Sequence, residues 1–359
     1  MMYRDVELLP EKTVGDSGTE TVDLDVTDPI TELVVRLGLT NGAATADQKI
    51  PTDIISKIEI VDGGTVYASV TGPEAAGIAF YESGVYPPCW YTDRASNGQN
   101  IALPLYFGRY VGDPLRNLDV TKLRNPQIKV TWSKDTLHLT GYVKLHIRAR
   151  VLTDVPGAAS ALLVKNVRTF TTAASGDEDT ELPTDYPIRR LFVRPYKASE
   201  LPYQVVSHYK LDCDEGRFIP FDLAAARVNE EVKQTFGRCT IRQLIVGDNA
   251  TFPDSFLGIA EAAFGSCETG LYIVNCFASG TPYINFHLLS DAGAAGSDVV
   301  TEMTCLGYLP HYVYAFPFGL KDDPATWFPA PAYRKVKLRL TQGVASGTCS
   351  ILVQQDRPL

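Results

Sequence analysis

Residues 29–36 read PITELVVR and residues 187–194 read PIRRLFVR, so five of eight positions are identical at a spacing of 158. Both copies place β-branched or aromatic residues after a proline, which is typical of a strand that follows a turn. A single match of this length arises easily by chance. A second match in the same order would indicate an internal repeat.

Such a second match is present near the end of each half. The pairs FG at 107–108 and DP at 113–114 recur as FG at 318–319 and DP at 323–324. Each copy is followed by an alternating stretch, a turn that contains glycine and a final strand-like stretch. Because the matches are collinear, they indicate two related halves.

The two halves differ in the length of their middle part. Pro29 and Gly108 are 79 positions apart, whereas Pro187 and Gly319 are 132 positions apart. We therefore predict a first domain at 1–155, a linker at 156–161, and a second domain at 162–359 with about fifty inserted residues between 200 and 310.

A period of two dominates the sequence. Residues 142–151 and 336–340 alternate between apolar and polar side chains, which indicates half-buried antiparallel strands. The 28 glycines and 23 prolines are spread evenly, as many short strands joined by turns require. We predict an all-β chain of two tandem sandwiches or jelly rolls, and periodicity does not choose between these two topologies.

Helical patterns are few and short, and we expect them in loops. They cover residues 72–80, 222–236 and 253–264. Asp222 is the expected N-cap of the second helix because it precedes a run of leucine and alanines.

The charge of the chain argues against nucleic acid as a direct partner. The net charge is −9, and the first eleven residues set Arg4 against Asp5, Glu7 and Glu11. Phosphate binding needs clustered lysine and arginine, so we expect no direct contact with nucleic acid. No run of apolar residues is long enough to span a bilayer, and the first residues do not resemble a signal peptide. We expect a protein that folds inside the cell that makes it, with its seven cysteines reduced and mostly buried.

The sequence contains no pattern that carries catalytic or metal chemistry. The five histidines lack the spacing of a metal site, and there is no phosphate-binding loop. GDSG at 15–18 resembles the nucleophile segment of trypsin-type serine proteases, but no histidine precedes residue 138, so we interpret it as a turn. The acidic run at 177–181 lacks the spaced ligands of a calcium loop. We predict no catalytic residue, no cofactor and no metal.

Two aromatic pairs are candidate contact residues. Trp90 and Tyr91 follow two prolines, and Trp327 and Phe328 precede Pro329, so we expect both pairs in rigid loops. Exposed aromatic residues of this kind anchor subunit contacts. Sugar stacking and packing in the core or between domains are the alternatives.

Residues 101–107, IALPLYF, carry a family resemblance. Together with the alternating strand that begins at 127, this stretch resembles major capsid proteins of the double jelly-roll lineage of tailless icosahedral DNA viruses, which includes adenoviruses and tectivirus-like phages. The second half keeps a proline and aromatic residues at 314–319, YAFPFG, without the Ala-Leu-Pro-Leu pattern.

The resemblance implies a structural protein rather than an enzyme. Three subunits of two jelly rolls each would form a pseudo-hexagonal homotrimer that tiles an icosahedral shell. The implied partners are further copies of the chain, minor capsid and penton proteins, and an internal lipid membrane. The implied location is the virion capsid, after assembly in the host cytoplasm. The insertion would then form an outer tower or a lateral clamp.

A carbohydrate-active enzyme and a carbohydrate-binding lectin or spike are the alternatives. The enzyme would need a pair of carboxylates in an aromatic cleft. A lectin or spike would place its aromatic residues at one distal end.

Overall fold

The computed structural model describes most of the chain. The described residues are 2–42, 50–92, 95–136, 139–198, 200–247, 255–256, 259–268, 275–276, 283–284 and 299–359, with the backbone alone described for those within 243–303. In this part of the chain no helix is long and apolar enough to cross a membrane.

The first unit is a sandwich of two antiparallel sheets. One sheet has the order β1-β9-β3-β7-β6 and the other has the order β2-β8-β4-β5. The strands are β1 (Met2–Val14), β2 (Ser17–Asp23), β3 (Ile30–Asn41), β4 (Ile55–Asp62), β5 (Thr65–Val70), β6 (Cys89–Thr92), β7 (Gly98–Tyr106), β8 (Pro126–Ser133) and β9 (Leu139–Thr153). The short helices are α1 (Pro51–Ile54), α2 (Gly72–Ser83) and the 3-10 turn η1 (Val120–Lys122).

The second unit repeats this strand order. Its sheets have the orders β10-β23-β12-β21 and β11-β22-β13-β14, which match β1-β9-β3-β7 and β2-β8-β4-β5 of the first unit. The strands are β10 (Ser160–Thr171), β11 (Asp177–Leu182), β12 (Ile188–Tyr196), β13 (Val206–Cys213), β14 (Phe218–Ala224), β21 (Tyr314–Pro317), β22 (Val336–Gln342) and β23 (Thr348–Pro358). The helices are α3 (Pro202–Val205), α4 (Ala225–Phe236), η2 (Pro324–Thr326) and η3 (Ala330–Ala332). In both units the first strand pairs with the last, which is the jelly-roll arrangement.

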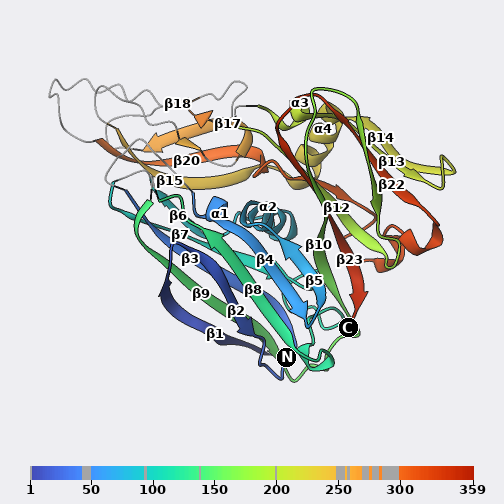
Figure 1. The fold of residues 1–359 in the computed structure, drawn as a ribbon, viewed down its shortest axis with the longest axis horizontal. Coiled ribbons are helices and arrows are strands. Elements are labelled where there is room, and N and C mark those ends of the chain that lie inside the picture. Colours follow the sequence, from blue (N-terminus) through green and yellow to red (C-terminus); the bar gives the residue numbers. More distant parts are fainter. Residues whose placement is uncertain are drawn as a thin grey trace.

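Between α4 and β21 the second unit has six further strands among the described residues. They are β15 (Cys239–Gly247), β16 (Ser255–Phe256), β17 (Ile259–Glu268), β18 (Asn275–Cys276), β19 (Tyr283–Ile284) and β20 (Val299–Pro310). Figure 1 shows β15, β17, β18 and β20 on the side of the molecule opposite to the two chain ends. Since β9 ends at Thr153 and β10 begins at Ser160, we propose that the first domain passes into the second within this interval.

Both large sheets pass from one unit into the other. β5 pairs in parallel with β10, where Ser69 lies opposite Lys165, and β6 pairs in parallel with β15. The resulting sheets have eight and nine strands. Figure 1 shows α2 in the middle of the molecule, between the two units. The units are therefore joined by backbone hydrogen bonds as well as by side-chain packing.

The predicted alternation of side chains is confirmed in the strands. In β9 the side chains of Val143, Leu145 and Ile147 are fully buried, while Lys144 and His146 between them point outward. β-branched and large aliphatic residues suit such a half-buried, pleated surface. The alternation in sequence therefore reports the two faces of the sheet.

The predicted helices have three different outcomes. The helix at 72–80 is confirmed as α2, which starts with a capping box formed by Thr71 and Glu74. The helix at 222–236 is confirmed as α4, but Asp222 as its N-cap is wrong. Asp222 lies in β14 opposite Lys210, where a strand position leaves its side chain to form an ion pair with that lysine.

The helix at 253–264 is wrong for the residues that the structure describes. Residues from Ile259 onward form β17, which pairs with β20. Alanine-rich segments have high helix propensity, and here tertiary strand pairing overrides it. Short apolar runs are ambiguous between the two states without knowledge of their partners.

The cysteines in the described part follow the prediction of free, mostly buried thiols. Cys213, Cys239, Cys305 and Cys349 are buried, Cys89 is half-buried, and none of these five forms a disulfide with a described residue. Burial raises the pKa of the Cys89 thiol to about 12. The side chains of Cys267 and Cys276 lie outside the described set.

Candidate functional site

The contact between the two units, which we call the seam, is the site that the fold builds most elaborately. It joins α2, β5 and the loop 107–118 of the first unit to β10, β12 and β23 of the second unit. Every residue of α2 except Ser83 is buried, so this helix has no solvent-facing side. A helix that is apolar and buried all round belongs to a core rather than to a surface loop.

Glycine allows α2 to approach the second unit closely. A Cβ atom at Gly77 would lie 2.7 Å from the Val313 side chain and 2.8 Å from the carbonyl oxygen of Pro310. Near this point the hydroxyl of Tyr81 donates a hydrogen bond of 2.5 Å to the carbonyl oxygen of Val313. The two units therefore meet at van der Waals contact along the helix.

A buried charge cluster lies at the C-terminal end of α2. The Glu82 carboxylate is 2.8 Å from Nη1 of Arg189 and 2.7 Å from Nη1 of Arg190. Nε2 of Gln354 donates a further hydrogen bond of 3.1 Å to this carboxylate. Burial by itself would raise the pKa of Glu82, but the two guanidinium groups hold this pKa below its ordinary value.

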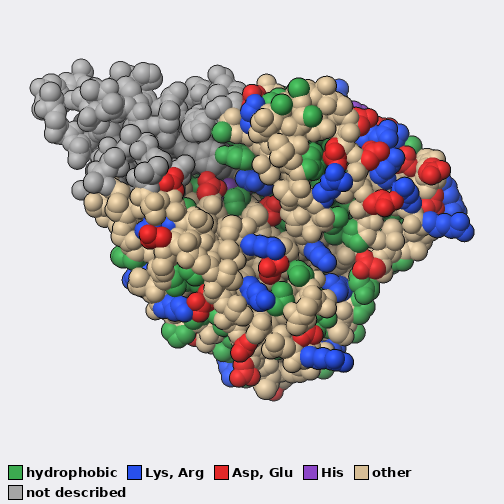
Figure 2. Space-filling model, in the orientation of Figure 1, with side chains coloured by type: hydrophobic (Ala, Val, Ile, Leu, Met, Phe, Trp, Pro, Cys, Tyr) green, Lys and Arg blue, Asp and Glu red, His purple; other side chains and the backbone are tan. Residues whose placement is uncertain are grey.

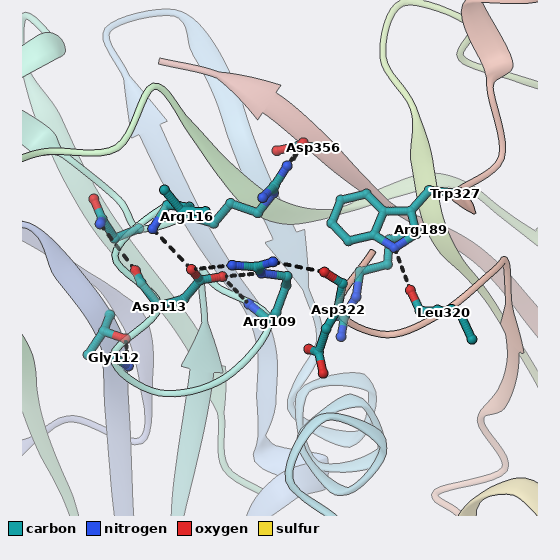
Figure 3. Close-up of polar contacts among 12 residues, drawn as sticks. Arg109, Gly112, Asp113, Arg116, Arg189, Leu320, Asp322, Trp327 and Asp356 are labelled. Atoms are coloured by element: carbon teal, nitrogen blue, oxygen red, sulfur yellow. Dashed lines mark hydrogen bonds and ion pairs between the residues drawn. The ribbon is translucent and has the colours of Figure 1, made fainter. Parts of the chain in front are cut away.

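The loops after β7 and β21 meet at the seam. Figure 3 shows Arg109 between Asp113 of its own loop and Asp322 of the other loop. Arg109 donates to both carboxylate oxygens of Asp113, at 2.7 and 2.9 Å, and to the carbonyl oxygen of Asp322 at 2.8 Å. Asp113 is fully buried, and burial would raise its pKa, but hydrogen bonds from Arg109 and two backbone amides lower it.

Trp327 lies among cations at the same place. The guanidinium carbon of Arg116 is 4.9 Å from the centre of its ring, and that of Arg189 is 5.9 Å away. Its Nε1 donates a hydrogen bond of 2.9 Å to the carbonyl oxygen of Leu320 (Figure 3). Arg116 also forms an ion pair of 2.7 Å with Asp356 of β23. The contact of Arg116 with Trp327 and its ion pair with Asp356 bridge the two units, whereas the contact of Arg189 with Trp327 lies within the second unit.

A neutral histidine lies at the other end of the seam. The ring of His311 stacks on Tyr86, whose hydroxyl lies 2.7 Å from Nε2 and 2.8 Å from the hydroxyl of Tyr91. Burial, helped by the charge of Arg194, lowers the pKa of His311 to about 3. A neutral imidazole is therefore part of the packed interface.

An apolar groove of the first unit is filled by the second unit. The groove, which we call the first groove, lies between β5, α2 and the end of β7. Leu162 and Val164 of β10 and Gln354 of β23 enter it, and only a cavity of about 30 Å³ is left. Protein interiors have few voids larger than a water molecule, and the small cavity left here shows that the contact is packed as tightly as such an interior.

Three solved structures of viral capsid proteins superimpose on nearly the whole chain. The chain superimposes on the major capsid protein of Sulfolobus Turreted Icosahedral Virus with a TM-score of 0.61 and 11% identity, over 99% of this chain and 96% of the other. It superimposes on the major capsid protein of bacteriophage PM2 with a TM-score of 0.55 and 12% identity, over 99% of this chain and 98% of the other. On the capsid structure of the virus PBCV-1 it superimposes with a TM-score of 0.58 and 11% identity, over 99% of this chain and 93% of the other.

The chain has the double jelly-roll fold of viral major capsid proteins. No protein-family model matches the sequence, and no curated protein matches it. The fold class expected from the strand pattern and from the resemblance is confirmed. The repeated octapeptides form β3 and β12, and the repeated FG and DP pairs lie in the two loops of the seam.

The double jelly roll places only one of the four predicted contact residues at the surface. Trp90 in β6 is 44% exposed and stays a candidate for subunit contact. For Tyr91, Trp327 and Phe328 the prediction of exposed loops is wrong, because their side chains are buried inside the subunit. Neighbouring prolines do place Trp327 and Phe328 outside regular strands, but Arg116 of the first unit lies over Trp327, and Phe318 and Tyr333 of the second unit pack on Phe328.

Sequence reasoning missed the charge cluster of the double jelly roll. One signal was available: where the first octapeptide has Thr31 and Glu32, the second has Arg189 and Arg190. Two adjacent arginines at the start of an otherwise apolar strand break the repeat. Their partner Glu82 is 107 positions away from Arg189, so no local pattern connects them.

The described part of the double jelly roll offers no assembled catalytic centre. Five cavities are lined by described residues, and none of these five brings two carboxylates together. No group of three or more metal-ligating side chains is found in the same part of the chain. No observation in this part of the molecule therefore favours the carbohydrate-active alternative.

Proposed function

We propose that this chain is the major capsid protein of an icosahedral virus. The observation that carries the proposal is the duplicated jelly roll, matched over 99% of the chain to viral major capsid proteins. A subunit with two similar units supplies two corners of a hexagon. Three copies related by a threefold axis then supply six corners, and hexagonal tiles cover a surface without gaps.

The seam supports this function because it fixes the angle between the two units. A tile keeps its outline only if the units within each subunit do not rotate against each other. Two shared sheets, the buried cluster at Glu82 and the filled first groove all oppose such rotation. Two units of one chain move relative to each other unless the interface between them is large and apolar.

Under this proposal the protein acts by self-association and not by catalysis. Its partners are further copies of the chain, neighbouring tiles, minor capsid and penton proteins and an internal membrane, and its location is the virion capsid after assembly in the host cytoplasm. Nucleic acid is not a direct partner. Figure 2 supports this point for the face it draws, where acidic and basic side chains are interspersed, most densely over β13 and β22. Ion pairs such as Arg339 with Asp179 lie in that region.

Mass and shape of the purified protein test the proposal. Size-exclusion chromatography with multi-angle light scattering is expected to give three times 39.3 kDa, about 118 kDa. Negative-stain microscopy of the same fraction is expected to show particles with six lobes. A monomer at every concentration, with a two-lobed outline, would contradict the proposal.

A further inference from the structure

The second unit contains a counterpart of the first groove, which we call the second groove. It lies between β14, α4 and the end of β21, and it forms a cavity of about 260 Å³. Its residues match those of the first groove position for position. The matched pairs are Val70 with Leu223, Ile78 with Glu231, Glu82 with Thr235, and Phe107 with Phe318.

The strand register establishes this correspondence independently of the cavities. Ile58 lies three residues after the start of β4 and pairs with Val70. Tyr209 lies three residues after the start of β13 and pairs with Leu223. α2 and α4 both have 12 residues, and both begin two residues after the matched strand position. The two grooves are therefore the same structure built twice.

The second groove differs from the first because no described residue of another unit enters it. The first groove receives Leu162 and Val164 of β10 and Gln354 of β23. The second groove is lined by its own unit alone, and Thr235 and Glu231 on its α4 side are exposed. Among the described residues the groove is therefore filled in one unit and open in its copy, and open apolar surfaces of this kind mark interaction sites.

The occupant of the first groove also has a counterpart. Gln354 pairs with Val164 and Arg190, and Arg150 pairs with Asp5 and Glu32. Because Glu32 matches Arg190 in the repeat, Arg150 matches Gln354, Asp5 matches Val164, and Tyr3 matches Leu162. Tyr3 is 54% exposed, so the matching face of β1 is free in the single subunit.

Among the described residues, no further strand pairs with two edges at these same places. β5 uses its edge to pair with β10, whereas its counterpart β14 ends the four-stranded sheet, and β1 ends the nine-stranded sheet. Exposed edges are sites of strand addition, and they are commonly blunted by charge, as Asp5 and Glu7 do in β1. The pairing of Lys165 with Ser69 corresponds to a pairing of Val6 with Asp222.

We propose that the second groove of one copy receives the outer face of β1 and β9 of a second copy, with β1 running parallel to β14 and Val6 beside Asp222. This inference rests on the proposed function, because it names the contact that closes the trimer. Each contact is head-to-tail, and head-to-tail contacts form a ring when the rotation closes. In a ring of three copies, seams and contacts between copies then alternate around the six units, and both use the same strands and the same kind of groove.

The contact between copies carries charge at two places where the seam does not. Glu231 stands where the seam has Ile78, and the exposed ion pair of Asp5 with Arg150, at 3.0 Å, stands where the seam has Val164 and Gln354. Arg150 and Glu231 would then face each other with opposite charge. A surface that is exposed before assembly needs such polar residues, whereas the permanently covered seam does not.

Substitutions at the second groove test this contact. Thr235→Trp places a large side chain in the groove at an exposed position, and Gln234→Trp places the same side chain on α4 outside the groove lining. We expect Thr235→Trp to weaken trimer formation at least tenfold by light scattering over a concentration series. Gln234→Trp is expected to assemble like the wild type, and circular dichroism should show both variants folded.

A cross-link tests the register directly. The double variant Val6→Cys/Asp222→Cys, treated with a short bis-maleimide, is expected to give covalent oligomers of up to three chains on a denaturing gel. Lys12→Cys/Asp222→Cys is the control, since Lys12 lies six residues along β1, roughly 20 Å away. Each single variant and the wild type report the background from the native cysteines.

The outcomes separate this inference from the proposed function. Trimers of Thr235→Trp as stable as those of the wild type, with no cross-link between residues 6 and 222, would overturn the contact while the capsid proposal stands. Cross-linked chains that grow beyond three copies would support the contact and overturn the trimer. A wild type that stays monomeric, without cross-link, would overturn both.

Discussion

Glu82 and Arg189 form an ion pair of 2.8 Å although their side chains are only 5% and 2% exposed. The pair joins α2 of the first unit to β12 of the second, and Arg190 contributes a second cation to the same carboxylate. Nε and Nη2 of Arg189 find no hydrogen-bond partner among the described residues, and its guanidinium lies over the ring of Trp327. One carboxylate thus balances two desolvated cations, and its removal has a large predicted effect.

Glu82→Gln is expected to destabilise the protein by about 3–5 kcal/mol, because it leaves two buried guanidinium groups without a counter-charge. Urea denaturation followed by circular dichroism measures the free energy of unfolding. Glu230→Gln is the matched control, because the pair of Glu230 with Arg227, at 2.8 Å, lies at the surface. We expect less than about 1 kcal/mol for this control. Equal effects of the two substitutions would refute the importance of the cluster.

His311 is expected to make stability depend on pH in a defined range. Its pKa is about 3 in the folded protein and near 6.5 when unfolded, so between these values the unfolded chain binds more protons. Stability due to this residue is therefore fully present above pH 6.5 and is lost as the pH falls toward 3. The expected slope is about 1.4 kcal/mol per pH unit well inside this range.

His311→Gln removes the titrating group and serves as the comparison. Between pH 7 and 5, where most carboxylates remain ionised, the free energy of unfolding of the wild type should fall more steeply than that of the variant. The comparison uses slopes, so a constant loss of stability in the variant does not affect it. Parallel curves would show that His311 is not buried in its neutral form.

Gly77→Ala is expected to destabilise the protein even though alanine is the better helix former. Helix propensity favours alanine by about 1 kcal/mol, but the new methyl group would overlap Val313 and Pro310 at less than 3 Å. Overpacking of this kind costs about 1–3 kcal/mol, so we expect a net loss or a shift of α2. Gly64→Ala is the control, since a Cβ atom there meets no atom within 4 Å. A stabilised Gly77→Ala variant would contradict the close contact.

Trp90 and Trp327 are expected to respond in opposite ways to substitution by serine. Trp327→Ser should lower the free energy of unfolding by about 3–5 kcal/mol, because the ring is buried between two arginines. Trp90→Ser should change it by less than about 1 kcal/mol and should weaken self-association instead, if the exposed ring contacts another subunit. Denaturation and light scattering on both variants separate the two effects. A Trp90→Ser variant with unchanged assembly would exclude Trp90 from the interface.

The strands of this protein were predictable because their signal is local. Residues 142–151 alternate in sequence, and β9 alternates between buried and outward side chains in the structure. The helix at 253–264 was predicted wrongly for the opposite reason. Its composition favours a helix, but β17 is stabilised by its pairing with β20, about forty residues away.

The sequence by itself determined that the chain contains two related units, since two collinear matches place β3 with β12 and one seam loop with the other. It also determined which residues face a core, because the two faces of a strand differ in polarity. Only the tertiary structure decided that Trp327 is buried while Trp90 is exposed, and that Glu82 meets Arg189 and Arg190. The physical reason is that burial and ion pairing depend on what the opposite unit brings to the same place. Those partners come from positions more than one hundred residues away.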